Sequence, residues 1–243
     1  MALAVTDELP HWNTIADLGW KTLLIGNGAS INLWSGFRYR SLYEQATLST
    51  ETQAIFDELD TVNFEQVLEC AYHARLVANA LRQQTAPIDA MYEGVRDALF
   101  ETVAASHVPW GSIPAGSFAR IARTINEYES IFTTNYDLVL YWSHLENLST
   151  VDLVDFFWNA RAIFDPTDTE VRFSSTTPVH YLHGAVHLWQ DDLLQNGKWT
   201  SADTNSLLNL GAHYVSSAGR RPLFVSEGSS EAKLRRIQQS PYL

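Results

Sequence analysis

The stretch Lys21-Thr22-Leu23-Leu24-Ile25-Gly26-Asn27-Gly28-Ala29-Ser30 decides the fold of this 243-residue chain. It opens with a short apolar run that is typical of a fully buried strand in a parallel sheet. Glycines and small polar residues follow, and glycine lets the backbone turn sharply and approach a ligand closely. The N-terminus of a following helix would favour a phosphate group there. Ile31 stands where the dehydrogenase fingerprint has its third glycine, so the motif alone predicts a tight turn as readily as a phosphate loop.

Three further apolar runs are predicted to be strands, at 130–134, 178–182 and 222–225. Each of them, like the first, is followed by a polar or glycine-containing segment. Because ligands bind at the carboxyl ends of the strands in parallel sheets, we expect these segments to meet in one site. The segments are Gly26–Ser30, Asn135–Asp137, His183-Gly184 and Ser226–Gly228.

A long helical stretch is expected between the first two strands, at about 48–128. Asn63 with Gln66 three residues later resembles a capping box, and apolar residues follow at helical spacing. The preceding segment, 31–42, is predicted to be mostly irregular. The order of strand, polar loop and helix predicts a single α/β domain over 1–243, with a Rossmann-like parallel sheet, helices on both faces and an inserted helical subdomain.

Composition limits the function classes. The net charge of −12, from 28 acidic and 16 basic residues, argues against nucleic-acid binding, which depends on neutralising phosphates. It does not exclude a small anion held by backbone N–H groups. The only cysteine, Cys70, allows neither an internal disulfide nor a cysteine zinc site, which fits the cytoplasm. No signal-peptide pattern occurs in Met1–Trp12, and no apolar run reaches the roughly 18–20 residues of a membrane span.

Polar side chains at the strand ends are the candidates for chemistry. Asn135 can donate and accept hydrogen bonds to a ribose or an ordered water, and its place at a strand end favours that function. Asp137 is more simply explained as a helix N-cap. His183 could act as a general base near neutral pH, although a lone histidine at a strand end is also a common structural residue. A metal site formed by His180, His183 and His187 is rejected, because positions 180 and 183 of a strand point to opposite faces.

Taken in order, these motifs resemble the sirtuin family, and more closely its prokaryotic sirtuin-like branch. Gly26–Ser30 followed by Gly36–Ser41 is similar to the Gly-Ala-Gly-x-Ser loop and the arginine-bearing segment of sirtuins. Thr133-Thr134-Asn135-Tyr136-Asp137 is similar to their Thr-Gln-Asn-Ile-Asp, and Leu182-His183-Gly184 to their Leu-His-Gly. Asn63-Phe64-Glu65 at the start of a long helix also resembles the sirtuin-like branch. The resemblance extends over about residues 20–240.

The resemblance implies an enzyme that consumes NAD. Deacylating sirtuins carry four zinc cysteines, which this chain lacks, so the implied activity is NAD hydrolysis without a metal, as in anti-phage effectors that deplete NAD. Asn135 would orient the ribose and the attacking water, and His183 would be the base. Backbone N–H groups of the glycine loop would hold the pyrophosphate. The implied NAD-binding residues are Gly26, Gly28, Ala29, Ser30, Thr134 and Asp137.

The resemblance also implies a missing part. Sirtuins continue beyond the region of Ser226–Gly228 with another strand and a Gly-x-Ser loop that helps to hold adenosine, whereas this chain ends at Leu243. We therefore expect the C-terminal part of the family fold to be absent. Either another chain, a second copy or a partner protein, completes or regulates the domain, or this chain is a truncated or degenerate member. The alternative to an enzyme is a sensor or subunit that binds NAD or ADP-ribose without turnover, and a third possibility is a structural remnant that does neither.

Overall fold

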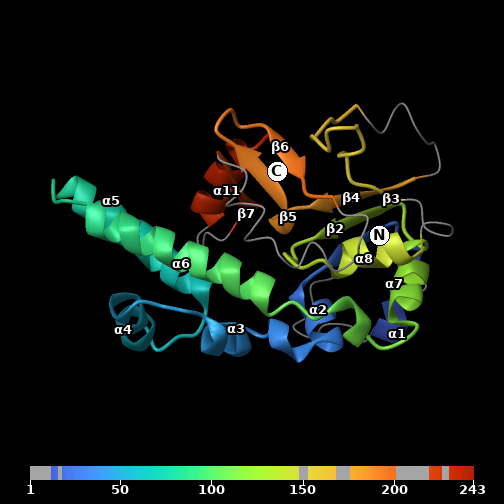
Figure 1. The fold of residues 1–243 in the computed structure, drawn as a ribbon, viewed down its shortest axis with the longest axis horizontal. Coiled ribbons are helices and arrows are strands. Elements are labelled where there is room, and N and C mark those ends of the chain that lie inside the picture. The colour runs from blue at the N-terminus through green and yellow to red at the C-terminus, as the bar shows by residue number, and fades with distance from the viewer. Residues whose placement is uncertain (1–11, 16–17, 148–152, 168–175, 201–218, 226–229) are drawn as a thin grey trace.

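The fold contains a four-stranded parallel sheet in the order β1-β2-β4-β3, which lies in the right half of Figure 1. The computed structural model describes residues 12–15, 18–147, 153–167, 176–200, 219–225 and 230–243. The register pairs Leu23 with Ile131 and Ile131 with Val179. The strands are β1 (Thr22–Ile25), β2 (Ser130–Thr133), β3 (Leu153–Val154) and β4 (Thr177–Tyr181), which confirms the first three predicted strands.

A second, three-stranded antiparallel sheet follows in the order β6-β5-β7. Its strands are β5 (Gly184–Asp191), β6 (Asn196–Lys198) and β7 (Arg220–Phe224). The run at 222–225 was expected in the parallel sheet, and that placement is wrong. The chain passes from β4 through His183 directly into the long strand β5, and β7 pairs with β5 rather than with β1 or β3. The predicted polar segment 226–228 lies outside the described residues.

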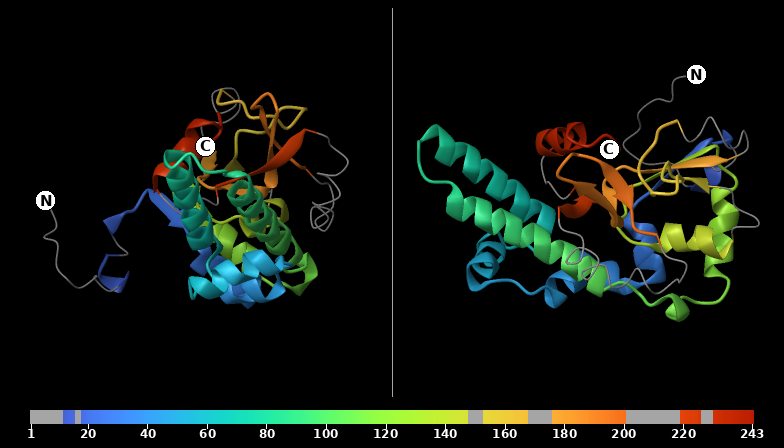
Figure 2. Two further views of the ribbon diagram at one scale, coloured as in Figure 1. Left: turned by 90° about the vertical axis from the view of Figure 1, so that its left-hand side faces the viewer. Right: turned by 45° about the horizontal axis from the view of Figure 1, so that its top comes forward.

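Helices connect the strands and flank the parallel sheet, so the fold class is the predicted α/β one (Figures 1 and 2). α5 and α6 form a hairpin that projects away from both sheets (Figure 2). None of the described helices is long and apolar enough to cross a membrane. The helices are α1 (Trp12–Ile15), α2 (Asn27–Leu33), η2 (Ser35–Phe37), α3 (Tyr39–Gln45), α4 (Thr50–Glu58), α5 (Phe64–Ala80), α6 (Ala86–Ala105), η3 (Trp110–Ser112), α7 (Ser117–Ile125), α8 (Val139–Glu146) and α11 (Ser230–Gln238).

Two sequence predictions about helices need correction. The segment 31–42, predicted to be irregular, is largely helical, because α2, η2 and α3 follow one another with single extended residues between them. The capping box at Asn63 is incomplete. Asn63 accepts a hydrogen bond from the Glu65 N–H and caps α5, but Gln66 accepts one from the Thr61 hydroxyl instead of reaching back to Asn63.

The strand β1 is not fully buried as predicted. Alternate residues are exposed, and Leu24 retains 66 % of its surface. Because side chains alternate between the faces of a strand, this pattern means that the face of β1 that carries Leu24 is not covered by other described elements; β1 is also an edge strand among the described strands, with β2 as its one neighbour. The central strands are better covered. Ile131 and Val179 are buried in a core cluster with residues of α7 and α8, which places these helices against one face of the sheet.

Candidate functional site

The start of α2 lies inside the motif that follows β1. Gly26 is the N-cap of this helix, and the Ala29 N–H already donates to the Gly26 carbonyl at 3.0 Å. Gly26 has a φ of −113° and Gly28 is not among the residues with positive φ, so the turn itself does not require glycine at either position. The backbone N–H groups predicted to hold a phosphate are therefore not equally available. The N–H of Ala29 is already hydrogen-bonded, whereas those of Asn27 and Gly28, the first two residues of the helix, have no acceptor within it.

Gly28 leaves an open space beside the helix. A Cβ atom placed there would meet no heavy atom within 4 Å, and the residue lines a cavity of about 840 Å³. Glycine within a helix costs roughly 0.5–1 kcal/mol relative to alanine. Neither the backbone conformation nor the neighbouring atoms therefore require glycine at position 28. Close approach of a ligand to the backbone would require it.

Asn135 follows the end of β2 and joins this strand to α2. Its Nδ2 donates a hydrogen bond of 2.7 Å to the hydroxyl of Ser30, and its backbone N–H donates to the Thr133 hydroxyl at 3.1 Å. The side chain is therefore fixed, and the residue is only 8 % exposed. Its Oδ1 is buried and finds no hydrogen-bond partner among the described residues. Since buried acceptors are nearly always paired, this oxygen is suited to a group that the chain does not supply.

Asp137 is also buried, and its carboxylate has a structural task. Oδ1 accepts a hydrogen bond of 2.9 Å from the N–H of Val139, the first residue of α8, but the N-cap of that helix is Leu138, so Asp137 lies one residue before the predicted capping position. Thr134 likewise makes a structural contact, because its N–H donates to the carbonyl of Ile25 at 3.0 Å and continues the pairing with β1. Both residues nevertheless line a cavity. Their predicted contacts with a ligand stay predictions.

His107 supports the same turn and was missed by the sequence analysis. Its Nε2 accepts a hydrogen bond of 2.8 Å from the N–H of Leu138, so Nδ1 carries the proton and donates to the Val108 carbonyl at 3.0 Å. Burial lowers the pKa of His107, and this effect is larger than that of the nearby Asp137, which raises it. The ring is therefore kept neutral by burial. Only its position in the loop between α6 and α7 could have drawn attention to it.

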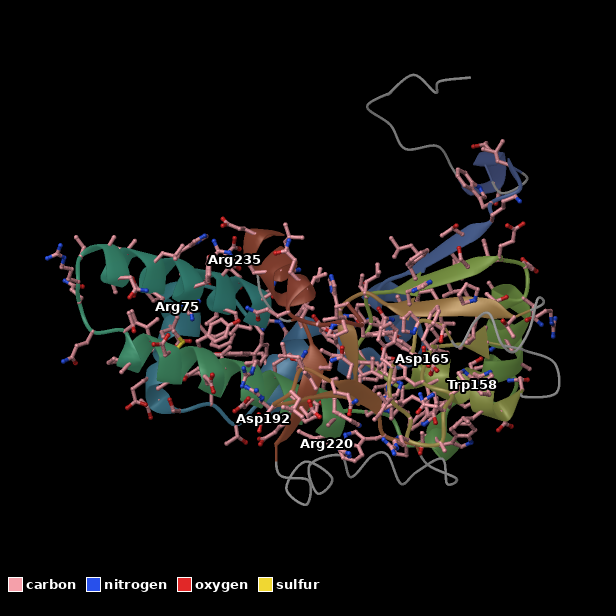
Figure 3. The ribbon with its side chains drawn as sticks, turned by 90° about the horizontal axis from the view of Figure 1, so that it is seen from above. Arg75, Trp158, Asp165, Asp192, Arg220 and Arg235 are labelled. Carbon is pink, nitrogen blue, oxygen red and sulfur yellow. The ribbon has the colours of Figure 1, made fainter. Side chains whose placement is uncertain are left out.

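His183 lies between β4 and β5, half buried. Burial lowers its pKa, and the ammonium group of Lys233 lowers it further against the opposing carboxylate of Glu65. Lys233 and Glu65 form an ion pair of 3.1 Å that joins α11 to the start of α5. A second contact of these helices places the Arg235 guanidinium over the Tyr72 ring at 5.9 Å, and Figure 3 shows Arg235 beside α5.

Because its pKa lies below the ordinary value, His183 is a neutral imidazole at neutral pH.

Two cavities meet at the strand-end turn. The larger, about 840 Å³, opens beside α2, and the smaller, about 250 Å³, contains His183. Asn135 and Asp137 line both of them. The structure therefore brings the predicted residues to one pair of adjoining cavities: Gly26, Gly28, Ala29 and Ser30 at the larger, Thr134 and His183 at the smaller, and Asn135 and Asp137 at both. Glu65, which also lines the smaller cavity, was noted in the sequence only as part of Asn63-Phe64-Glu65.

The fold and these cavities define a Rossmann-like α/β protein with a polar site at the carboxyl ends of its parallel strands. Residues 23–243 match a family described as a domain of unknown function, DUF4917, and the chain belongs to this family. No curated protein matches the chain. The likeness to sirtuin-like NAD hydrolases stays a prediction from the motifs.

Proposed function

We propose that this protein is an NAD hydrolase that cleaves the bond between nicotinamide and ribose and releases nicotinamide and ADP-ribose. The observation that carries the proposal is the buried Oδ1 of Asn135, which has no hydrogen-bond partner in the part of the chain that the structure describes and lies at the junction of two cavities. The open space at Gly28 and the neutral imidazole of His183 on either side support it. In the cell, we infer a cytoplasmic effector that depletes NAD during phage infection, acting as an oligomer or with a partner protein.

The main requirement of this reaction is that the protein position the ribose and the attacking water. Nicotinamide is bonded to ribose as a pyridinium and leaves as a neutral molecule, so no general acid is required. The ribose carbon passes through a state resembling an oxocarbenium ion, as in other glycoside cleavages. Asn135 Oδ1 accepts a hydrogen bond from a ribose hydroxyl or from the attacking water. Water adds to the ribose carbon, and His183 accepts its proton and returns it to solvent.

The direct test is incubation of the purified full chain with NAD and measurement of free nicotinamide. The proposal expects nicotinamide and ADP-ribose in equal amounts from the wild type. It expects no release from a folded His183→Ala variant. Binding of NAD by calorimetry without release of nicotinamide would instead identify a binding subunit. Full activity in the His183→Ala variant would remove this residue from the mechanism.

The pH dependence of the reaction follows from the environment of His183. Burial and Lys233 lower its pKa below the ordinary value of about 6.5, so the base stays neutral to a lower pH than a free histidine. We expect kcat/KM to be constant through neutral pH and to fall only as the pH drops through that lowered pKa. Lys233→Gln should move this acid limb to higher pH. An acid limb that starts above pH 6.5 in the wild type would contradict the assignment.

Replacing Gly28 by alanine should separate stability from function. The added methyl group meets open space in the chain, so the free energy of unfolding should rise by up to about 1 kcal/mol. The same methyl group would occupy the space that NAD needs, so KM for NAD should increase. Gly94→Ala is the matched control, because Gly94 lies in α6 with the same open surroundings but lines neither cavity. Equal kinetics in the two variants would contradict the role of Gly28.

A further inference from the structure

Helix α5 carries apolar residues on two of its faces. The buried face repeats every three or four residues, with Phe64, Val67, Leu68, Ala71, Tyr72 and Ala78. An outer face repeats with the same spacing on the side away from it, with Cys70, His73, Ala74, Val77, Ala80 and Leu81. This outer face contains no acidic residue, lysine or arginine. A surface helix normally carries charged and polar residues there, opposite its buried face.

The outer face is exposed because the hairpin of α5 and α6 extends past the other described elements (Figures 1 and 2). Val77 retains 58 % of its surface and Leu81 retains 62 %. The other helix of the hairpin follows the usual pattern, since the exposed side of α6 carries the acids Glu93, Asp97 and Glu101. A continuous apolar surface on one helix, beside a charged one on its neighbour, is typical of a protein interface.

Two residues of opposite charge lie at the ends of the outer face. Glu69 comes directly before it and Arg82 directly after it. Neither of them forms an ion pair with a described residue. Arg75, the one formally charged residue between them, is already paired with Asp89 of α6 at 3.7 Å. The outer face therefore has an acidic end, an uncharged middle and a basic end.

These charges match when the face meets itself in the antiparallel direction. We propose that the outer face of α5 binds the outer face of a second copy about a twofold axis, which joins two hairpins into a four-helix bundle. Glu69 of each copy then lies opposite Arg82 of the other, at both ends of the contact. A parallel pair would instead set like charges against each other. The proposal gives the oligomer inferred above one defined surface, and it does not depend on NAD cleavage.

The same antiparallel register also matches the side chains in size. Val77 lies opposite Ala74 of the other copy, and Leu81 lies opposite Cys70, because both members of each pair are equally distant from the twofold axis. A larger side chain thus meets a smaller one along the contact, which favours close packing of two helices. None of residues 69–82 lines either cavity, so the pairing leaves the candidate site open.

Sedimentation of the purified full chain at several concentrations tests the proposal, and we expect the wild type to be a dimer. Val77→Glu/Leu81→Glu should raise the dissociation constant at least about a hundredfold, because it buries like charges beside one another in the contact. Both positions are exposed in the single chain, so the fold should persist, which circular dichroism checks. Leu193→Glu/Leu194→Glu, at exposed positions between β5 and β6, is the matched control and should dimerise like the wild type.

Reversing the end charges tests the direction of the pairing. Glu69→Arg and Arg82→Glu each set like charges together at both ends of the dimer, so each should raise the dissociation constant about three- to thirtyfold. The double variant Glu69→Arg/Arg82→Glu restores opposite charges and should return close to the wild-type value. Equal dissociation constants in all four proteins would overturn the antiparallel pair.

The mass of the particle and the release of nicotinamide are separate measurements. A wild type that stays monomeric up to about 100 µM, or a Val77→Glu/Leu81→Glu variant that dimerises as well as the wild type, overturns this inference. Release of nicotinamide by such a protein leaves NAD cleavage standing. A wild-type dimer that is lost in this variant supports the interface even where no nicotinamide is released.

Discussion

Replacing Asn135 by alanine is expected to lower kcat for nicotinamide release by about 10²–10³, the cost of removing one preorganised polar group from a reaction centre. The effect should be large because Asn135 is held in place before any ligand arrives. Ser30 fixes its Nδ2 at 2.7 Å, and Oδ1 has no hydrogen-bond partner among the described residues, so it could accept one from the proposed substrate without further reorganisation. Steady-state rates of nicotinamide release, with circular dichroism to confirm the fold, measure the loss.

Asn79→Ala supplies the control for this variant, because Asn79 is exposed on the projecting α5 helix (Figure 1). Its kinetics should equal those of the wild type. Asn135→Asp is a sharper comparison, since it keeps the shape of the side chain but places a negative charge in a buried position next to Ser30 and Asp137. It should fold and release nicotinamide poorly. A kcat close to that of the wild type in both Asn135 variants would exclude Asn135 from the mechanism.

The sequence predicted the site better than it predicted the sheets. Parallel strands end at a common edge, so recognising the apolar runs before Gly26, Asn135 and His183 was sufficient to place these residues together. That inference needed only the positions of the apolar runs along the chain. It did not depend on knowing the neighbours of each strand, and for that reason the error about the partner of β7 left it intact.

Contacts between distant residues account for what the sequence could not predict. His107 supports the turn at Leu138 through one hydrogen bond across 31 residues, and Lys233 meets Glu65 across 168 residues. No local pattern encodes such pairs. The exposure of Leu24 could not be predicted for a related reason, because a run of apolar residues looks alike whether or not distant elements cover that face of the strand.

The largest effect on stability is expected at Lys198, which lines neither of the two candidate cavities. Its ammonium group lies 2.6 Å from Asp155 Oδ2, and the two side chains are only 9 % and 12 % exposed. Burial alone would raise the pKa of Asp155, but the charge of Lys198 outweighs it and holds the pKa below its ordinary value. The neighbouring His187 does not supply that charge: its pKa is lowered to about 3, and burial, which is the largest cause, remains when Lys198 is replaced.

Lys198→Met should therefore lower the free energy of unfolding by about 3–5 kcal/mol, because it leaves a buried carboxylate without a cation. Urea unfolding followed by tryptophan fluorescence measures this change. Lys21→Met is the matched control: the pair of Lys21 with Glu129 has nearly the same length, 2.8 Å, but its side chains are 72 % and 68 % exposed, so little change is expected.

The double variant Lys198→Met/Asp155→Leu decides whether the lost charge or the lost packing is responsible. Replacing both members of a buried pair by apolar groups is often neutral, so most of the stability should return.

The pH dependence of the unfolding free energy gives a second criterion. The lowered pKa of Asp155 stabilises the wild type above about pH 4, and this contribution disappears as the pH falls through that lowered value. In Lys198→Met the unpaired carboxylate takes up a proton at a higher pH, so its deficit relative to the wild type should shrink on acidification. A deficit that is independent of pH and persists in the double variant would assign the loss to packing around Tyr141, over whose ring the ammonium group lies.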